Sequence, residues 1–190
     1  MNILMHSILP KLFFFINSYD ENHIRKLQKK VAIIFRNYET EYNEELILNI
    51  KKACQKQGRK FFLSNNLKLA IKLNLDGVYI PSFNKTINFN KNNFKKKFII
   101  IGSAHSIKEI KIKEQQGVKL IFLSPLFKTN KKTKYLNPVK FNYLASKTPK
   151  KIIALGGITS KNLNKLKMVN AFGFAGITYF ENNDKIKLQK

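Results

Sequence analysis

Short runs of almost continuous apolar residues recur along the chain, and most are followed by a polar stretch in which apolar residues return at helical spacing. The runs contain many β-branched and aromatic residues and show no alternation with polar positions. Such runs are typical of strands that are buried on both faces of a parallel sheet. The pattern predicts strands at residues 11–16, 31–36, 60–63, 76–80, 98–101, 118–123, 151–155 and 174–178.

Residues that cap helices stand at the ends of the intervening segments. Asp20 and Ser106 are expected to cap the first turn of a helix, while Gly58 and Gly117 are each expected to end one. Residues 81–97, which are rich in Asn and Lys, are expected to form a loop with one helical turn at most. Helices are therefore predicted at 20–30, 41–57, 67–73, 106–116, 138–147 and, capped by Thr159 or Ser160, up to residue 168.

Strands alternate with helices along the whole chain, which is the pattern of a parallel sheet. Because no change of composition divides the eight units, we expect a single α/β domain over residues 1–190, folded as a closed (β/α)8 barrel (a TIM barrel) rather than an open sheet. A length of 190 residues is at the low end for this fold, so several helices should be short. The polar residues that follow the strands should then meet at one rim: Arg36, Ser64, Asn65, Asn84, Ser103, His105, Thr129, Asn130, Lys131, Lys132, Gly156, Gly157 and Thr178.

The loop after the sixth predicted strand concentrates groups that bind phosphate. Ser124 and Pro125 end the strand, since proline cannot donate to the ladder. Hydroxyl, amide and ammonium donors follow at residues 129–132. Donors crowded at the carboxyl end of a buried parallel strand are suited to a phosphorylated small molecule. A solvated basic loop is the alternative that this segment alone leaves open.

The chain is strongly basic. Lys and Arg number 36 against 11 Asp and Glu, a formal net charge of +25, which would ordinarily indicate nucleic acid or an anionic surface as partner. Only Arg25, Arg36 and Arg59 carry the side chain most expected at base-reading sites, and the charge is spread over nearly every segment. The abundance of Lys, Asn, Ile and Phe is the bias of an AT-rich genome, so we do not expect nucleic acid as a partner.

The single cysteine, Cys54, excludes an internal disulfide and fits a reducing compartment. Its place in a helical pattern predicts a small buried side chain rather than a nucleophile. No apolar run approaches the roughly 20 residues of a membrane span, and the start of the chain lacks the basic region of a signal peptide. We therefore expect a cytoplasmic protein with no membrane partner.

Five segments together resemble a known family. They are D-G-V-Y-I, I-I-G-S-A-H-S, L-S-P-L-F-K-T-N-K-K, I-I-A-L-G-G-I-T and G-F-A-G-I-T, and they are similar, in order, to motifs of the thiamine phosphate synthase/TenI family. The resemblance runs from about residue 32 to residue 178 and implies a barrel that binds phosphorylated small molecules. The family synthase joins hydroxymethylpyrimidine diphosphate to thiazole phosphate with Mg²⁺ on the diphosphate, whereas the TenI branch isomerises the thiazole ring.

The resemblance implies that the thiazole-phosphate site is retained. Thr129 matches the first threonine of the family's P-T-x-T-K loop and Lys132 its final lysine, with Lys131 in place of the second threonine. Gly156 and Gly157 can bring backbone amides close to a phosphate because they carry no Cβ; a tight turn is their alternative role. The remaining substrate-binding residues that the resemblance implies are Asn130, Ile177 and Thr178.

The same resemblance implies an eroded site for the pyrimidine diphosphate. Asn65 and Asn84 stand where the family has the two aspartates that would hold Mg²⁺, and amides supply oxygens but no charge. Arg36, Ser103 and Lys132 remain as partners for a diphosphate. We therefore predict weak binding of Mg²⁺, with its ligands undetermined.

His105 matches a histidine of both branches, which in TenI-like proteins acts as a general base on the thiazole. Imidazole titrates near neutral pH, as such a proton transfer requires. Capping of the following helix, or a hydrogen bond at the rim, is the alternative role. His6 and His23 are expected to be ordinary surface residues.

The resemblance favours a thiamine phosphate synthase-like transferase, with Arg36, Ser103, His105 and Lys132 as catalytic residues. A TenI-like thiazole tautomerase and a non-catalytic protein that binds thiazole phosphate are the alternatives, and the pattern of retained and lost residues fits the tautomerase better. The sequence indicates neither the thiazole tautomer, nor the pyrimidine, nor the oligomeric state.

Overall fold

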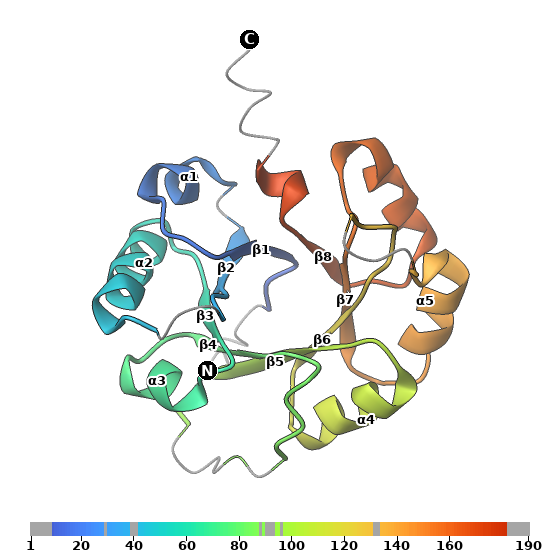
Figure 1. Cartoon of the computed structure of the whole chain (residues 1–190), viewed down its shortest axis with the longest axis horizontal. Helices are drawn as coiled ribbons and strands as arrows, with labels where there is room; N and C mark the ends of the chain where they lie inside the picture. The colour runs from blue at the N-terminus through green and yellow to red at the C-terminus, as the bar shows by residue number, and fades with distance from the viewer. Residues whose placement is uncertain are drawn as a thin grey trace, which may run out of the picture.

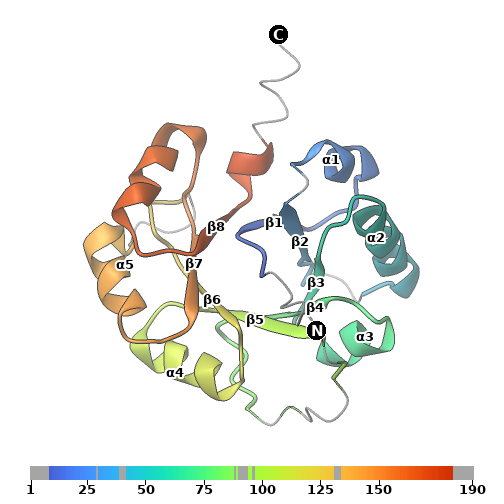
Figure 2. The same cartoon turned by 180° about the vertical axis from the view of Figure 1, so that it is seen from behind.

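The strands of the chain close on themselves. In the computed structural model, which describes residues 9–28, 30–38, 42–87, 89, 94–95, 97–130 and 134–181, eight parallel strands follow one another around a barrel in chain order. The last strand pairs with the first, with Leu12 opposite Phe174 and Phe14 opposite Gly176. Figures 1 and 2, which view the ring of strands from opposite sides, show the helices arranged around its outside. The predicted (β/α)8 barrel is confirmed.

The elements are short and lie close to their predicted positions. The strands are β1 Leu12–Ile16, β2 Val31–Phe35, β3 Phe61–Ser64, β4 Gly77–Ile80, β5 Ile99–Ala104, β6 Leu120–Leu123, β7 Lys151–Leu155 and β8 Gly173–Gly176. The helices are α1 Glu21–Lys26, α2 Glu44–Lys56, α3 Leu67–Lys72, α4 Ile107–Gln115 and α5 Asn137–Ala145, and a 3₁₀ helix at Ser160–Met168 precedes β8. Both α1 and α3 have only 6 residues, which lets a short chain complete the barrel.

Two strands, β5 and β8, end two or more residues away from their predicted last residue. β5 continues past residue 101 to Ala104 because Gly102 pairs with both β4 and β6, and Ser103 and Ala104 pair with β6. β8 ends at Gly176 rather than at residue 178. Beyond it the amide of Phe180 donates to the carbonyl oxygen of Ile177 at 3.0 Å and begins a helical turn, which takes the backbone out of the sheet.

The last predicted helix is wound as a 3₁₀ helix rather than an α-helix. The side chain of Asn162 accepts from the amide of Thr159 at 2.9 Å and donates to the carbonyl oxygen of Gly157 at 2.7 Å. Such side-chain bonds to nearby backbone compete with regular helical bonding. None of the 9 residues of this helix is buried, so packing against the barrel does not impose the α form.

Aromatic rings fill the interior of the barrel. Along β1, Phe13 and Phe15 belong to the inner cluster of buried side chains, whereas Phe14 belongs to the layer between strands and helices. Phe122 of β6 lies edge-on to Phe13 and to Tyr79, with ring centroids 4.9 Å and 5.5 Å apart. The interior is therefore a packed core, and Tyr79 closes it at the end of the barrel where the strands terminate.

The capping residues act as predicted. Asp20 accepts from the amide of His23 at 3.1 Å, and Ser106 accepts from the amide of Glu109 at 3.3 Å, at the start of α1 and α4. Cys54 is fully buried in α2, and burial raises the pKa of its thiol to about 12. A thiol that stays protonated at neutral pH is a poor nucleophile, which agrees with a packing role.

Across the described part of the chain, no helix has the length and apolar character needed to cross a membrane.

Candidate active site

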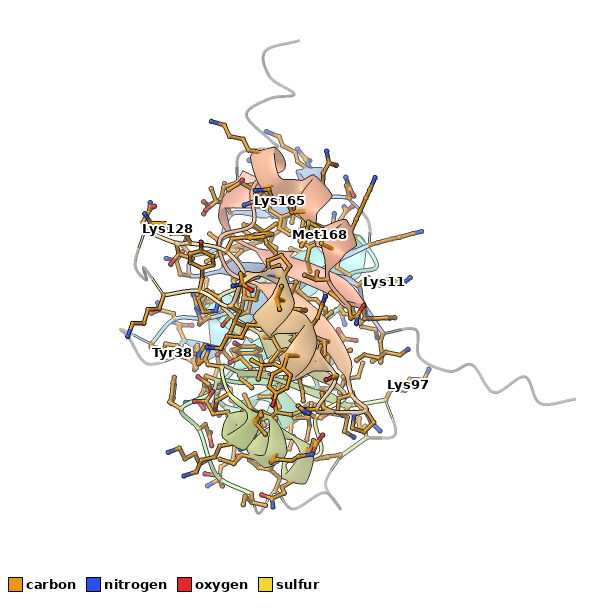
Figure 3. The ribbon with its side chains drawn as sticks, turned by 90° about the vertical axis from the view of Figure 1, so that its right-hand side faces the viewer. Lys11, Tyr38, Lys97, Lys128, Lys165 and Met168 are labelled. Carbon is orange, nitrogen blue, oxygen red and sulfur yellow. The ribbon has the colours of Figure 1, made fainter. Side chains whose placement is uncertain are left out.

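A cavity of about 300 Å³ opens at the carboxyl ends of the strands. Figure 3 shows Tyr38, after β2, and Lys128, after β6, at one end of the barrel, with Lys11 and Lys97 at the opposite end. The cavity is lined by residues from the carboxyl ends of several strands and from the loops that follow them: Arg36, Tyr38, Tyr79, Pro81, Ser82, Phe83, Ser103, His105, Ser124, Pro125, Thr129, Leu155 and Gly156. Of the predicted site residues, Arg36, Ser103, His105, Thr129 and Gly156 therefore share one concavity.

The buried side chains of Tyr79 and Ser103 bring two neutral hydroxyl groups to the cavity. The Tyr79 ring is 3% exposed and meets Phe15 edge-on, with ring centroids 5.1 Å apart. Burial raises the pKa of Tyr79, so its phenol stays protonated, and it shares a hydrogen bond with the hydroxyl of Ser103. These two side chains thus offer polar hydrogen-bonding groups without charge.

His105 is held in one orientation at the end of β5. Its Nδ1 lies 2.6 Å from the carbonyl oxygen of Ser124 and 3.1 Å from the Ser124 hydroxyl. A carbonyl oxygen only accepts, so Nδ1 carries the hydrogen and Nε2 of a neutral ring keeps its lone pair. The backbone amide of His105 also donates to a carboxylate oxygen of Glu109 at 2.6 Å. The side chain is therefore arranged as an acceptor of protons at Nε2.

The loops after β6 and β7 pack directly on each other. The amides of Leu126 and Phe127 donate to the carbonyl oxygens of Leu155 and Gly156 at 2.8 Å and 3.1 Å. Gly157 has a φ of +69°, and a Cβ there would lie 2.4 Å from the carbonyl oxygen of Lys128. The glycine pair is thus required by a close backbone approach, and Gly156 in addition borders the cavity.

Arg36 stands between this cavity and a second one of about 210 Å³. Its guanidinium lies over the ring of Phe15, 5.0 Å from the centroid, and its backbone amide donates to the carbonyl oxygen of Ile16 at 2.8 Å. The second cavity is lined by Phe14, Phe15, Ile16, Asn17, Ser18, Asp20, His23, Ile24, Arg36, Ile177 and Glu181. One guanidinium can therefore serve ligands in either cavity.

The other predicted residues are placed less centrally. Ile177 borders the second cavity, and Asn130, Gly157 and Thr178 border neither of the two. Lys131 and Lys132 lie outside the described residues, as does His6. His23 is not an ordinary surface residue, because its ring is half-buried and stacks on Phe14 with centroids 5.0 Å apart.

Tyr38 and Phe83, which none of the sequence motifs includes, form one wall of the cavity, and Tyr42 supports the same loops. The hydroxyl of Tyr38 lies 2.7 Å from that of Ser64, and its ring meets Phe83 edge-on at 5.7 Å. The hydroxyl of Tyr42 donates to the carbonyl oxygen of Ser64 at 2.7 Å, and burial raises its pKa to about 12. Their only signal in the sequence was their position in the loops after the second and fourth strands.

Asn65 and Asn84, which stand where the family has its two aspartates, bond to each other. Nδ2 of Asn84 donates to Oδ1 of Asn65 at 2.8 Å, and Oδ1 of Asn84 accepts from the amide of Thr86 at 3.0 Å. No cluster of three or more His, Cys, Asp or Glu side chains suited to a metal occurs among the described residues. Both amide oxygens are engaged and neither residue carries a carboxylate, so this pair does not fit Mg²⁺.

A family model, curated relatives and a solved structure all resemble this chain over most of its length. The family model described as "Thiamine monophosphate synthase" matches residues 22–180. A putative thiamine-phosphate synthase 2 from Aquifex aeolicus is 27% identical over 190 residues, covering 90% of this chain and 98% of the relative. A thiamine-phosphate synthase from Pelagibacter ubique is 30% identical over 191 residues, covering 96% and 91%. The solved thiamine phosphate pyrophosphorylase from Pyrococcus furiosus has a TM-score of 0.74 at 18% identity, with 95% of this chain and 96% of that one covered.

Proposed function

The chain belongs to the thiamine monophosphate synthase family, and we propose that it is a transferase that joins a pyrimidine, activated as its diphosphate, to a thiazole phosphate at the rim cavity. The observation that carries the proposal is the convergence of Arg36, Ser103, His105, Thr129 and Gly156 on one cavity. These residues come from the carboxyl ends of four strands, β2, β5, β6 and β7. They supply a cation, hydroxyls, an imidazole and a glycine backbone around one space. A phosphorylated heterocycle is the ligand class that such a set suits.

In the reaction, the ring nitrogen of the thiazole forms a bond to the methylene carbon of the pyrimidine, and the bond from that carbon to the diphosphate oxygen breaks. The electron pair leaves with the diphosphate. Arg36 and Ser103, together with Lys132 from the loop after β6, would stabilise that charge as it develops. Thr129 and Gly156 would hold the phosphate of the thiazole, which orients its nitrogen toward the carbon.

Magnesium on the diphosphate is the family's additional source of positive charge. The amide pair at Asn65 and Asn84 does not suit it, so we assign no step of the reaction here to a metal. The chain's own cations, Arg36 first among them, must then supply most of the electrostatic stabilisation, and we expect a slow reaction.

A direct assay tests this function. Purified protein is incubated with hydroxymethylpyrimidine diphosphate and thiazole phosphate, with and without Mg²⁺, and thiamine phosphate is quantified. We expect slow formation of product with only a small gain from Mg²⁺. Absence of product together with absence of thiazole-phosphate binding would overturn the proposal. Rapid Mg²⁺-dependent turnover would contradict the inference that this chain has lost the family's Mg²⁺ site.

The amide pair and the orientation of His105 favour a second candidate, isomerisation of the thiazole. That reaction needs a phosphate site and a base but no metal. Nε2 of His105, left with its lone pair by the bond at Nδ1, would accept the proton. Isomerisation in the absence of the pyrimidine substrate identifies this activity, and tight binding without either reaction would identify a non-catalytic binder of thiazole phosphate.

A further inference from the structure

A lysine is fully buried beneath the loop that follows β4. Lys113, on α4, has no exposed surface, and its ammonium donates to the carbonyl oxygens of Pro81 at 2.8 Å and Asn84 at 2.9 Å. The third bond goes to the side-chain oxygen of Gln116 at 2.8 Å. Gln116, which is also fully buried, donates to the carbonyl oxygens of Asn84 at 3.0 Å and Thr86 at 2.8 Å.

Four of these five bonds hold backbone carbonyl oxygens of the loop after β4, and the fifth joins Lys113 to Gln116. The amide of Asn84 donates to the carbonyl oxygen of Pro81 at 3.1 Å, which closes the turn, and the ammonium of Lys113 binds both of the carbonyl oxygens at its ends. The stem of the lysine passes over Gly102 of β5, where a Cβ would lie 3.0 Å from Cδ of Lys113. The strand, the helix and the turn are therefore built around this side chain.

Burying the ammonium group of Lys113 carries a large cost in free energy. Lysine is almost never fully buried unless it is paired, because its charge must be removed from water. The three hydrogen-bond acceptors of Lys113 are neutral, and Glu109, one helical turn earlier, is the carboxylate whose charge acts on it. An apolar side chain such as methionine would fill a similar volume without that cost in free energy. It would form no hydrogen bonds to the turn, so ordering of the turn is what the lysine adds.

The turn that Lys113 holds is part of the cavity wall. Pro81, Ser82 and Phe83 line the cavity, and Asn84 carries the bridge to Asn65 on the neighbouring loop. A divalent cation between two carboxylates would tie these two loops together. Here the amide bridge joins the loops, and a buried ammonium holds one of them.

We propose that Lys113, assisted by Gln116, is a positioning residue that holds residues 81–86 in the conformation required by the cavity, in place of a metal ion. Its effect on substrate rests on the proposed function, whereas its effect on the turn does not. Lys113 touches no substrate, and it acts through the turn alone.

The test compares Lys113→Met with Lys111→Met by hydrogen–deuterium exchange of the ligand-free protein. Lys111 lies on the same helix but is exposed and pairs with Glu114, so its replacement removes the same charge without disturbing the turn. We expect the amides of Asn84 and Thr86 to exchange at least about tenfold faster in the Lys113 variant only. Equal exchange in the two variants would overturn the proposal.

Binding and turnover provide the second readout. With thiazole phosphate and the pyrimidine diphosphate, Lys113→Met should raise KM at least threefold with a smaller change in kcat, because the wall of the cavity is loosened while the reacting groups remain. Should the Lys113 variant fail to fold, Gln116→Leu, which removes three of the five bonds, must speed exchange in the same amides or the proposal fails. Lack of turnover in the unmodified protein would count against the proposed function and leaves the exchange result decisive for Lys113.

Discussion

Asn84 donates its side-chain amide to Oδ1 of Asn65 at 2.8 Å and thereby joins the loops after β3 and β4. Asn65 adopts a φ of +57°, a left-handed conformation that asparagine tolerates better than most residues. Asn84 in turn accepts from the amide of Thr86. The pair is thus an uncharged, hydrogen-bonded link between the two loops, at the position where the family resemblance implies two carboxylates.

Replacing both residues, Asn65→Asp with Asn84→Asp, should create a metal site. Two facing carboxylates repel each other without a cation and offset its charge when one is bound. We expect Mg²⁺ affinity to rise by about tenfold or more, equivalent to about 1.4 kcal/mol, and Mg²⁺-dependent turnover to rise with it. The gain should exceed the sum of the single variants, because both side chains would share one ion.

Calorimetric titration with Mg²⁺ measures that affinity, and Asn66→Asp serves as the matched control. Asn66 caps α3 by accepting from the amide of Leu69 at 3.0 Å, so an aspartate there adds the same charge and keeps the cap. A gain in the control equal to that in the double variant would show that charge alone is responsible and would contradict the site.

His105→Asn should lower any isomerisation of the thiazole by about 10²- to 10⁴-fold, the usual contribution of a positioned base. The transferase reaction should fall much less, since it requires no proton acceptor at that point. Initial rates of both reactions in the same preparation measure the difference.

Ser106→Ala separates catalysis by His105 from a role in helix capping. It removes the cap of α4 beside His105 and should cost about 1 kcal/mol of stability with little change in rate. If the two variants lose activity and stability in parallel, the histidine serves the helix rather than the reaction.

Gly157→Ala should abolish thiazole-phosphate binding and lower stability by about 3 kcal/mol, because a left-handed residue would acquire a Cβ that overlaps the backbone of the β6 loop. Gly58 has a similar φ of +62°, but a Cβ there meets nothing within 4 Å. Gly58→Ala should therefore cost only about 1 kcal/mol and leave binding intact. Urea unfolding and a binding titration on both variants test this, and equal effects would refute the packing argument.

Stability should depend on the protonation of Lys113. Burial lowers its pKa from 10.5 to about 8, with Glu109 opposing the shift. Below pH 8 the group is charged in both states and its penalty is constant; between pH 8 and 10.5 the unfolded chain binds more protons, so stability rises with pH. Between pH 8 and 9.5, the free energy of unfolding of the unmodified protein should rise by about 2 kcal/mol relative to that of Lys113→Met.

Urea unfolding at several pH values, with Lys111→Met as the reference for an exposed lysine, measures this gain. If the free energy of unfolding depends on pH in the same way for all three proteins, the pKa of Lys113 is not lowered and its ammonium group is not buried.

The strand pattern and the cap residues made the fold predictable. β7 lies at its predicted bounds, and Asp20 and Ser106 cap their helices, because both signals are local. The extension of β5 to Ala104 depended on pairing with its neighbours, which the residues themselves do not show. The side-chain bonds of Asn162 that accompany the 3₁₀ winding are equally specific to this chain.

The site was predictable only as a set of loops. Parallel strands bring their carboxyl ends together, so Arg36, His105 and Gly156 had to meet, but the division of the rim into two cavities arises from packing of Arg36 over Phe15. Lys111 and Lys113 are indistinguishable in sequence, as two lysines among apolar residues of one helix. Only the carbonyl oxygens of a loop distant in sequence make one of them part of the interior.

The closure of the barrel by β1 and β8 has a consequence for biosynthesis. β1 leaves the ribosome early, and its second edge stays unpaired until residues 173–176 arrive opposite residues 12–14. Throughout that interval β1 and the most recent strand both present unpaired backbone, which a second nascent chain can pair with. The barrel therefore closes only when β8 has been synthesised and has paired with β1. A chain truncated before Gly173 would keep both edges of the sheet exposed.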